Sequence, residues 1–224
     1  MNAPQATARA WEGTPDWYLD WQGRAVAIIA SGPSAKKANV AALRGKMPVI
    51  AIKENIELAP WADVAYGCDA AWWRNKLGLP DFRGLKVSWK GDNAHPPADY
   101  PDIRRIDITI NSDELIFDPT GVVGSGGNSG YQALNLAVQF GANRILLIGF
   151  DMHDRSGVHW YGRNRGNGRN NPSQENFRRW RLAFEHAAPK LKARGIEIVN
   201  ASENSALTCF ERRKVEETIS HWKV

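Results

Sequence analysis

Residues 122–151 carry three consecutive patterns that constrain the fold of the whole chain. A glycine- and serine-rich segment, 124–130, comes first, and apolar residues at helical spacing follow over 134–141. The run 145–149 is apolar throughout, as expected for a parallel strand that is buried on both faces. Asp151 follows this strand directly. In open α/β sheets, ligands bind at the carboxyl ends of strands and at the amino termini of helices, so we expect the active pocket here.

Strand and helix patterns alternate along the rest of the chain. Strands are expected at 24–30, 47–52, 63–67, 85–89, 103–108, 145–149 and 196–199. Helices are expected at 34–43, through Trp72 and Trp73, at 173–194 and at 210–222, with 111–120 irregular. This alternation predicts an α/β fold with a single doubly wound, mostly parallel, Rossmann-like sheet. We predict an amino-terminal arm at 1–22 and one nucleotide-binding domain at 23–224.

Small polar clusters follow several of the expected strands. They are 31–34, 53–55, 68–69, Asp151 and 200–205. Because the carboxyl ends of parallel strands share one edge of a sheet, these clusters are expected to line a single crevice. Asn128, Ser129 and Gly130 begin the central helix and would add oriented N–H donors that suit an anion. Ser34 and Asp69 have helix capping as their alternative role, and Asp151 could cap the turn after its strand.

The segment 152–172 is long, polar and rich in Gly, Asn and Arg. A connection of this length inside a compact domain is usually a lid or a binding loop, so we predict a mobile lid after the Gly-Phe-Asp strand end. Two histidines, His153 and His159, lie in this segment. Their pKa near neutrality suits proton transfer.

Composition narrows the function classes. The net charge of +5 favours an anionic partner. No apolar run approaches the roughly 18 residues that a membrane span needs, and residues 1–21 lack the apolar core of a signal peptide. Cys68 and Cys209 have neither a metal-binding spacing nor a disulfide framework. These features predict a cytoplasmic protein.

Three of these segments resemble the family 42 sialyltransferases. Residues 30–35, Ala-Ser-Gly-Pro-Ser-Ala, resemble the first turn of that family. Residues 125–152 resemble its glycine-rich helix start and its following Gly-x-Asp strand end, and 196–207 resemble its Asn-Ser-Leu turn. The resemblance implies a glycosyltransferase that uses a CMP-sugar donor and a sugar or other hydroxyl acceptor, with no tightly bound cofactor. It also implies nucleotide contacts at Gly32, Ser34, Asn55, Asp69, Ser129, Gly130 and Ser205.

The resemblance also suggests catalytic roles. The family's general base is a histidine in the segment after the Gly-x-Asp strand, which His159 matches by location, with His153 as its competitor and Asp151 beside them. A histidine can take the proton of an acceptor hydroxyl. Arg163 and Arg165 could neutralise the leaving phosphate. The sequence departs from the family at Ser31, which stands in place of an asparagine, and at Lys53, which lies near another one.

Other functions stay open as alternatives. The same block resembles the DUF115 group, which includes 6-hydroxymethyl-dihydropterin pyrophosphokinases, and similar small proteins occur in phage genomes. A pyrophosphokinase or other nucleotidyl enzyme would use ATP and magnesium, with Asp151, Asp154 and His153 as the candidate metal cluster. A non-catalytic nucleotide-binding module and a nucleic-acid-modifying protein are further alternatives, the last less favoured. Homo-oligomer formation also stays open.

Overall fold

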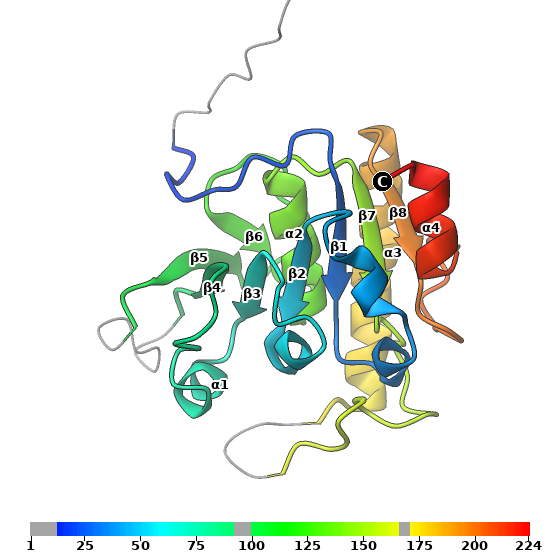
Figure 1. Ribbon diagram of the computed structural model, residues 1–224, viewed down its shortest axis with the longest axis horizontal. Coiled ribbons are helices and arrows are strands. Elements are labelled where there is room, and N and C mark those ends of the chain that lie inside the picture. Colours follow the sequence, from blue (N-terminus) through cyan, green and yellow to red (C-terminus); the bar gives the residue numbers. More distant parts are fainter. Residues whose placement is uncertain (1–12, 92–99, 166–170) are drawn as a thin grey trace, which may run out of the picture.

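The computed structural model describes residues 13–91, 100–165 and 171–224. In these ranges nine strands form one sheet in the order β6-β5-β4-β3-β2-β1-β7-β8-β9, and every neighbouring pair is parallel (Figure 1). The strands are β1 (Ala25–Ile29), β2 (Val49–Ile52), β3 (Val64–Gly67), β4 (Leu85–Trp89), β5 (Ile103–Thr109), β6 (Val122–Gly124), β7 (Arg144–Ile148), β8 (Glu197–Asn200) and β9 (Glu211–Arg212). The predicted α/β sheet is confirmed.

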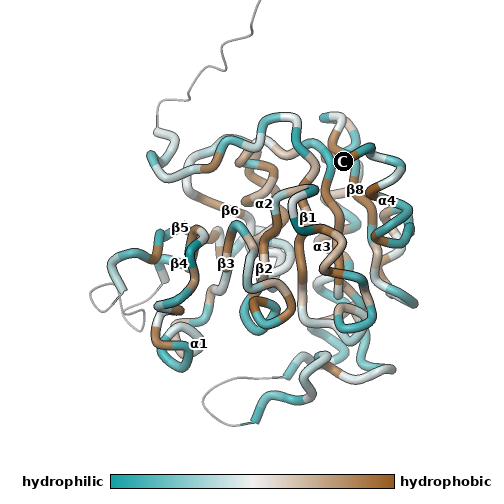
Figure 2. The backbone as a smooth tube through the Cα atoms, viewed as in Figure 1, coloured by the Kyte–Doolittle hydropathy of each residue, from teal (hydrophilic) through white to brown (hydrophobic). Residues whose placement is uncertain are grey.

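Helices cover both faces of the sheet. One apolar core packs α2 (Ser129–Gln139) and α3 (Gln174–Ala193) against one face. The second core packs the 3-10 helices η1 (Pro33–Lys36) and η2 (Val40–Leu43) with α1 (Ala70–Asn75) and α4 (Val215–Trp222) against the other. Hydrophobic residues accordingly follow the central strands in Figure 2. None of the helices within the described residues is long and apolar enough to cross a bilayer.

The chain order reverses between β1 and β7. The sheet grows from β1 outward to β6, and α2 then brings the chain back to β7, which pairs with the other side of β1. Five residues of each strand pair in register, from Ala25 opposite Arg144 to Ile29 opposite Ile148. Such a reversal splays the two following connections to opposite faces and leaves a crevice at the carboxyl ends of the strands. The candidate site therefore has a topological origin.

Two predicted helices differ from the structure, and two short strands were not predicted. The helix expected over 34–43 is two short 3-10 helices, because Asn39 leaves the helical region (φ −77°, ψ 71°) and separates them. Strands β6 and β9 escaped prediction because runs of only three and two residues give no periodic signal. Helix α4 begins at Val215 rather than near 210, since β9 occupies the preceding residues.

The amino-terminal segment that the structure describes packs on the core. Tyr18 and Trp21 both contact the Phe140 ring edge-on, with centroid distances of 5.0 Å. The Tyr18 hydroxyl donates to Gln139 Oε1 at 2.6 Å. Residues 1–12 of the predicted arm lie outside the described residues.

Asn135 joins α2 to the edge of the sheet. Its Oδ1 accepts from the backbone N–H of Gly124 (2.8 Å) and of Ile116 (3.0 Å), and its Nδ2 donates to Ile116 O (2.6 Å). The side chain is fully buried. One residue thus pairs with three backbone groups, of which the Ile116 carbonyl also accepts from Gln139 Nε2 at 3.0 Å. The two N–H groups, of Gly124 and Ile116, depend on Asn135 for these hydrogen bonds.

Replacing Asn135 by Ala should lower the free energy of unfolding by about 3 kcal/mol, since each buried group left unpaired costs roughly 1–3 kcal/mol. Urea denaturation followed by far-ultraviolet circular dichroism measures the change. Asn143→Ala is the matched control, because Asn143 is exposed and makes only backbone hydrogen bonds among those described. A loss at Asn135 no larger than at Asn143 would contradict the anchoring role.

Candidate functional site

A cavity of about 470 Å³ opens at the carboxyl edge of the sheet. Its walls come from the ends of β1, β2, β3 and β7, from the start of α2, from the first turns of α3, and from the segment after β7. The polar and aromatic lining residues include Ser31, Lys53, Glu54, Cys68, Asp69, Asn128, Ser129, Asp151, His153, His159, Tyr161, Asn164, Asn176, Phe177 and Trp180. Four of the five predicted polar clusters reach this cavity. The cluster 200–205 does not line it, because Ser202 and Ser205 turn to the Phe150 backbone from behind the wall.

Ser34 and Asp151 join the two strand ends at the topological reversal. The Ser34 hydroxyl donates to Asp151 Oδ2 at 2.6 Å, and the Ser34 N–H donates to Oδ1 at 3.2 Å. Gly32 lies between them, and a Cβ there would overlap both the Asp151 carboxylate and the Gly149 carbonyl. Glycine is therefore required by close approach. Burial raises the pKa of Asp151 above its usual value, and the two bonds from Ser34 partly offset that effect.

The start of α2 presents backbone donors to the cavity. Asn128 is the N-cap, and its side chain accepts from the Tyr131 N–H at 2.9 Å. The N–H groups of Ser129 and Gly130 have no partner within a helix at these positions. Gly130 allows Phe150 to approach, since a Cβ would lie 2.7 Å from its ring. The positive end of the helix dipole and these donors suit an anion.

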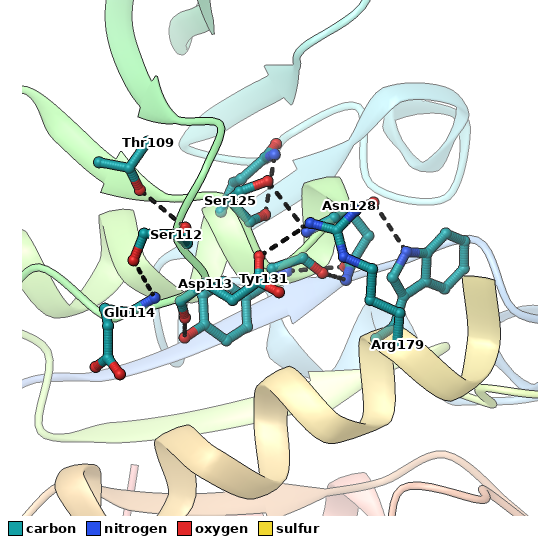
Figure 3. A network of polar contacts seen from close by, with 12 residues as sticks. Thr109, Ser112, Asp113, Glu114, Ser125, Asn128, Tyr131 and Arg179 are labelled. Carbon is teal, nitrogen blue, oxygen red and sulfur yellow. Dashed lines mark hydrogen bonds and ion pairs between the residues drawn. The ribbon is translucent and has the colours of Figure 1, made fainter. Parts of the chain in front are cut away.

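The loop before α2 is held rigidly by its neighbours (Figure 3). Tyr131 donates its hydroxyl to the Asp113 carbonyl, and Arg179 of α3 pairs with the Asp113 carboxylate at 3.2 Å. The Ser125 N–H donates to Ser112 O at 3.1 Å. Trp180 Nε1 donates to the Gly127 carbonyl at 2.8 Å. The helix start is therefore positioned before any ligand arrives.

The two candidate histidines differ in what their rings can do. His153 is buried, its Nε2 lies 2.9 Å from Asn204 O, and its Nδ1 accepts from the Arg155 N–H at 3.2 Å. Both ring nitrogens are thus occupied, which makes His153 a structural residue. Within the described residues, His159 makes a hydrogen bond through Nδ1 alone, which lies 3.2 Å from Gly162 O.

His159 has the features of a base. Because a carbonyl oxygen only accepts, Nδ1 carries the proton and Nε2 of the neutral ring keeps its lone pair. The ring stacks on Tyr161 with centroids 4.9 Å apart. Burial lowers the pKa of His159, and the positive charge of Lys53 lowers it further. The imidazole is therefore mainly neutral at pH 7.

Charged and polar side chains lie at the carboxyl ends of β2 and β3. The Lys53 ammonium pairs with the Asp69 carboxylate, and the Cys68 thiol lies 3.2 Å from the Ser129 hydroxyl. Burial raises the pKa of Cys68, so the thiol stays protonated. Asp69 is the N-cap residue of α1 but makes no capping hydrogen bond. Its carboxylate instead reaches Lys53, across the mouth of the cavity.

The structure separates the predicted site residues into three groups. Eight line the cavity: Gly32, Asp69, Asn128, Ser129, Gly130, Asp151, His153 and His159. Three are buried supports behind it: Ser34, Asn55 and Ser205. Arg163, Arg165 and Asp154 lie outside its lining, where Arg163 and Arg165 are exposed and Asp154 accepts from Gln174 at 2.8 Å.

The supports brace the cavity wall. Asn55 donates to Ser31 Oγ (3.0 Å) and accepts from Trp160 Nε1 (2.9 Å). Ser205 donates to the Phe150 carbonyl (2.5 Å) and accepts from Asn200 Nδ2 (3.0 Å). The polar groups of these side chains are hydrogen-bonded to protein partners. They would therefore affect a ligand only by positioning the residues that they contact. Ser34 likewise does not cap a helix, because its hydroxyl donates to Asp151.

The first part of the predicted lid is anchored to the domain. The Trp160 N–H donates to Ser31 O at 3.0 Å, and Val158 is buried. This segment covers the strand ends at the bottom of Figure 1. Its mobility stays a prediction, and residues 166–170 lie outside the described residues.

Several lining residues are not among the predicted site residues. In the sequence, Phe177 and Trp180 lie on the apolar side of the expected helix 173–194, a pattern that does not separate a core from a cavity wall. Tyr161 could have been identified from the sequence, because it is an aromatic residue two positions after the candidate base His159. Over the described residues, no group of three or more His, Cys, Asp or Glu side chains is placed to hold a metal ion.

No protein-family model and no curated protein sequence matches the chain. Among solved structures, it is similar to the sialyltransferase CstII from Campylobacter jejuni in complex with cytidine-5′-monophosphate, with a TM-score of 0.54, 13% identity and 86% of each chain covered. A complex of CST-II with a trisaccharide acceptor and CMP gives a TM-score of 0.53 at 13% identity, over 85% of this chain and 86% of that one. The complex of CstII with the substrate analogue CMP-3FNeuAc gives 0.51 at 13% identity, over 85% of each chain.

These similarities establish a sialyltransferase-like α/β fold. They confirm the fold implied by the resemblance to family 42. They give no support to the DUF115 or pyrophosphokinase readings.

The raised pKa of Asp151 predicts a specific dependence of stability on pH. Because the folded-state pKa lies above the unfolded one, the folded protein binds more protons in this range. The contribution of Asp151 to the free energy of unfolding should therefore fall as the pH rises from about 4 through the folded pKa.

Urea denaturation of the wild type and of Asp151→Asn between pH 4 and 7 isolates this contribution. The stability of the wild type relative to the variant should decrease with rising pH. A difference that stays constant, or grows, would show that the carboxylate is not penalised by burial.

Proposed function

We propose that this protein is a nucleotide-sugar-dependent glycosyltransferase that uses a CMP-sugar donor. The observation that carries the proposal is the pairing, in one cavity, of an anion-binding helix start with a neutral histidine whose Nε2 keeps its lone pair. The cavity lies at the topological reversal, where α/β sheets bind nucleotides. The similar solved structures hold CMP or a CMP-sugar analogue.

The donor phosphate would lie at the start of α2, near Ser129 and Gly130. The aromatic walls offered by Tyr161, Phe177 and Trp180 would contact the nucleoside or sugar. Gly32 would let the ligand approach the end of β1 closely, while Asp69 and Asn128 add polar groups at the rim. This assignment uses the residues that line the cavity and leaves the three buried supports as positioning residues.

In the reaction, an acceptor hydroxyl oxygen forms a bond to the anomeric carbon of the donor sugar. The bond between that carbon and the phosphate oxygen breaks, and CMP leaves with the electron pair. The hydroxyl proton passes to Nε2 of His159. The helix-start donors stabilise the charge that develops on the leaving phosphate. Asp151 orients the β1 turn through Ser34 and takes no proton in this scheme.

A ligand screen tests the donor class. Thermal unfolding with CMP, CMP-sialic acid, UDP, GDP, ATP and ATP with magnesium should show stabilisation by CMP and CMP-sialic acid without metal. A ligand at 100 times its Kd adds about 2.7 kcal/mol. Stabilisation by ATP only in the presence of magnesium would favour phosphoryl or pyrophosphoryl transfer instead, and no shift with any nucleotide would remove the basis of the proposal.

Replacement of the base tests the chemistry. His159→Gln should bind CMP like the wild type and lose transfer by about 100-fold or more, the usual contribution of a general base. His153→Gln is the comparison, and it should act mainly on stability because both of its ring nitrogens bind backbone. Equal transfer rates for wild type and His159→Gln would refute the assignment.

The pH profile gives an independent check. Since the pKa of His159 lies below 6.5, transfer by the wild type should hold steady from pH 8 down to about 6.5 and fall at lower pH as the base becomes protonated. A fall that begins above pH 7 would point to another group.

A further inference from the structure

Lys53 is the one cationic residue among the described residues that line the cavity, apart from the histidines. Three carboxylates line the same space: Glu54, Asp69 and Asp151. A phosphate entering this cavity therefore meets more negative than positive side-chain charge. The donors at the start of α2 offset part of this repulsion, and Lys53 is the one described lining side chain that supplies a full positive charge.

The backbone at Lys53 is unusual. Its φ is +52°, in the left-handed region that a residue other than glycine occupies at a cost. Such conformations persist where the surroundings impose them, and they gather at functional sites. Here it follows β2 directly at the first residue of η3 (Lys53–Glu57), and the side chain reaches Asp69.

Contacts link Lys53 to the proposed phosphate site. Lys53 pairs with Asp69, whose neighbour Cys68 lies 3.2 Å from the Ser129 hydroxyl at the start of α2. The Lys53 ammonium is thus linked to the start of α2 through Asp69, Cys68 and Ser129. Burial lowers the pKa of Lys53, but Cys68, which is a thiolate at the high pH where Lys53 titrates, and the ion pair and hydrogen bond with Asp69 raise it above its usual value. The side chain stays charged at any pH at which the enzyme would work.

We infer that Lys53 is the residue that neutralises the donor phosphate, and that it exchanges its ion pair with Asp69 for that phosphate when the donor binds. The inference rests on the proposed function and identifies how the site tolerates an anion despite its carboxylates. Asp69 keeps the ammonium oriented in the empty site, so little side-chain entropy remains to be lost on binding. Arg163 and Arg165, which lie outside the lining, are not needed for this role.

Calorimetric titration of CMP and of cytidine separates phosphate binding from nucleoside binding. Lys53→Asn removes the charge and keeps a residue that tolerates positive φ. It should weaken CMP binding about 10- to 100-fold, the range for a charge-assisted hydrogen bond, and leave cytidine binding unchanged. Lys53→Arg should restore most of the preference for CMP over cytidine.

The matched control is Lys76→Asn. Lys76 pairs with Glu57 at 2.8 Å outside the cavity, and its side chain is 29% exposed against 28% for Lys53. It should leave both affinities unchanged. Asp69→Asn should strengthen CMP binding, because it releases Lys53 and removes a repulsive charge.

The outcomes distinguish the two proposals. Unchanged CMP binding by Lys53→Asn, or equal loss of CMP and cytidine, would overturn the role of Lys53 and leave the proposed function standing. Weaker CMP binding by Asp69→Asn would overturn the exchange. A wild type that does not prefer CMP to cytidine would overturn the proposed function and this inference with it.

Discussion

The contact between Ser34 and Asp151 joins the two strand ends between which the cavity opens, and the rest of the site depends on it. Asp151 accepts from both the hydroxyl and the N–H of Ser34, which closes the β1 turn onto the end of β7. On the opposite side, Ser202 Oγ accepts from the Phe150 N–H at 2.7 Å, and Ser205 donates to the Phe150 carbonyl. The chain at Phe150 and Asp151 is thus hydrogen-bonded to residues that follow β1 and to residues that follow β8. At neutral pH, burial of the charged Asp151 carboxylate lowers the free energy of unfolding. The same carboxylate holds the β1 turn, in which Gly32 has no room for a side chain.

A second set of contacts holds the start of α2 in place. Asn135 ties α2 to the backbone of β6 and of the loop before it, while Tyr131 and Arg179 hold Asp113 in that loop. The donors of Ser129 and Gly130 are consequently directed at the cavity in the empty protein. Donors that are oriented in advance need no reorganisation as charge develops, which is how electrostatic stabilisation lowers a barrier. Under the proposed function, these contacts would therefore serve catalysis as well as stability.

The sequence predicted the sheet and the edge at which the cavity opens, because alternating buried strands and helices leave few topologies and parallel strands end at one edge. It could not predict which polar residues face the ligand. Asn55 and Ser205 lie in the right clusters, yet their side chains turn into the protein to hold Trp160 and Phe150. His153 and His159 have the same chemistry in sequence and differ only through the backbone atoms that meet their rings. Such distinctions arise from tertiary contacts, which no periodicity encodes.

Charge placement within the cavity reconciles two opposing demands. A base must be unprotonated near neutral pH, whereas an anionic donor needs positive charge. Burial and the nearby Lys53 both lower the pKa of His159, so the same cation that would attract a phosphate also keeps the imidazole neutral. Asp69 is paired with Lys53 while the site is empty. Since a phosphate carries the charge that Asp69 would give up, the electrostatic surroundings of His159 would change little when the donor replaces that carboxylate. A single lysine can in this way serve both binding and base chemistry.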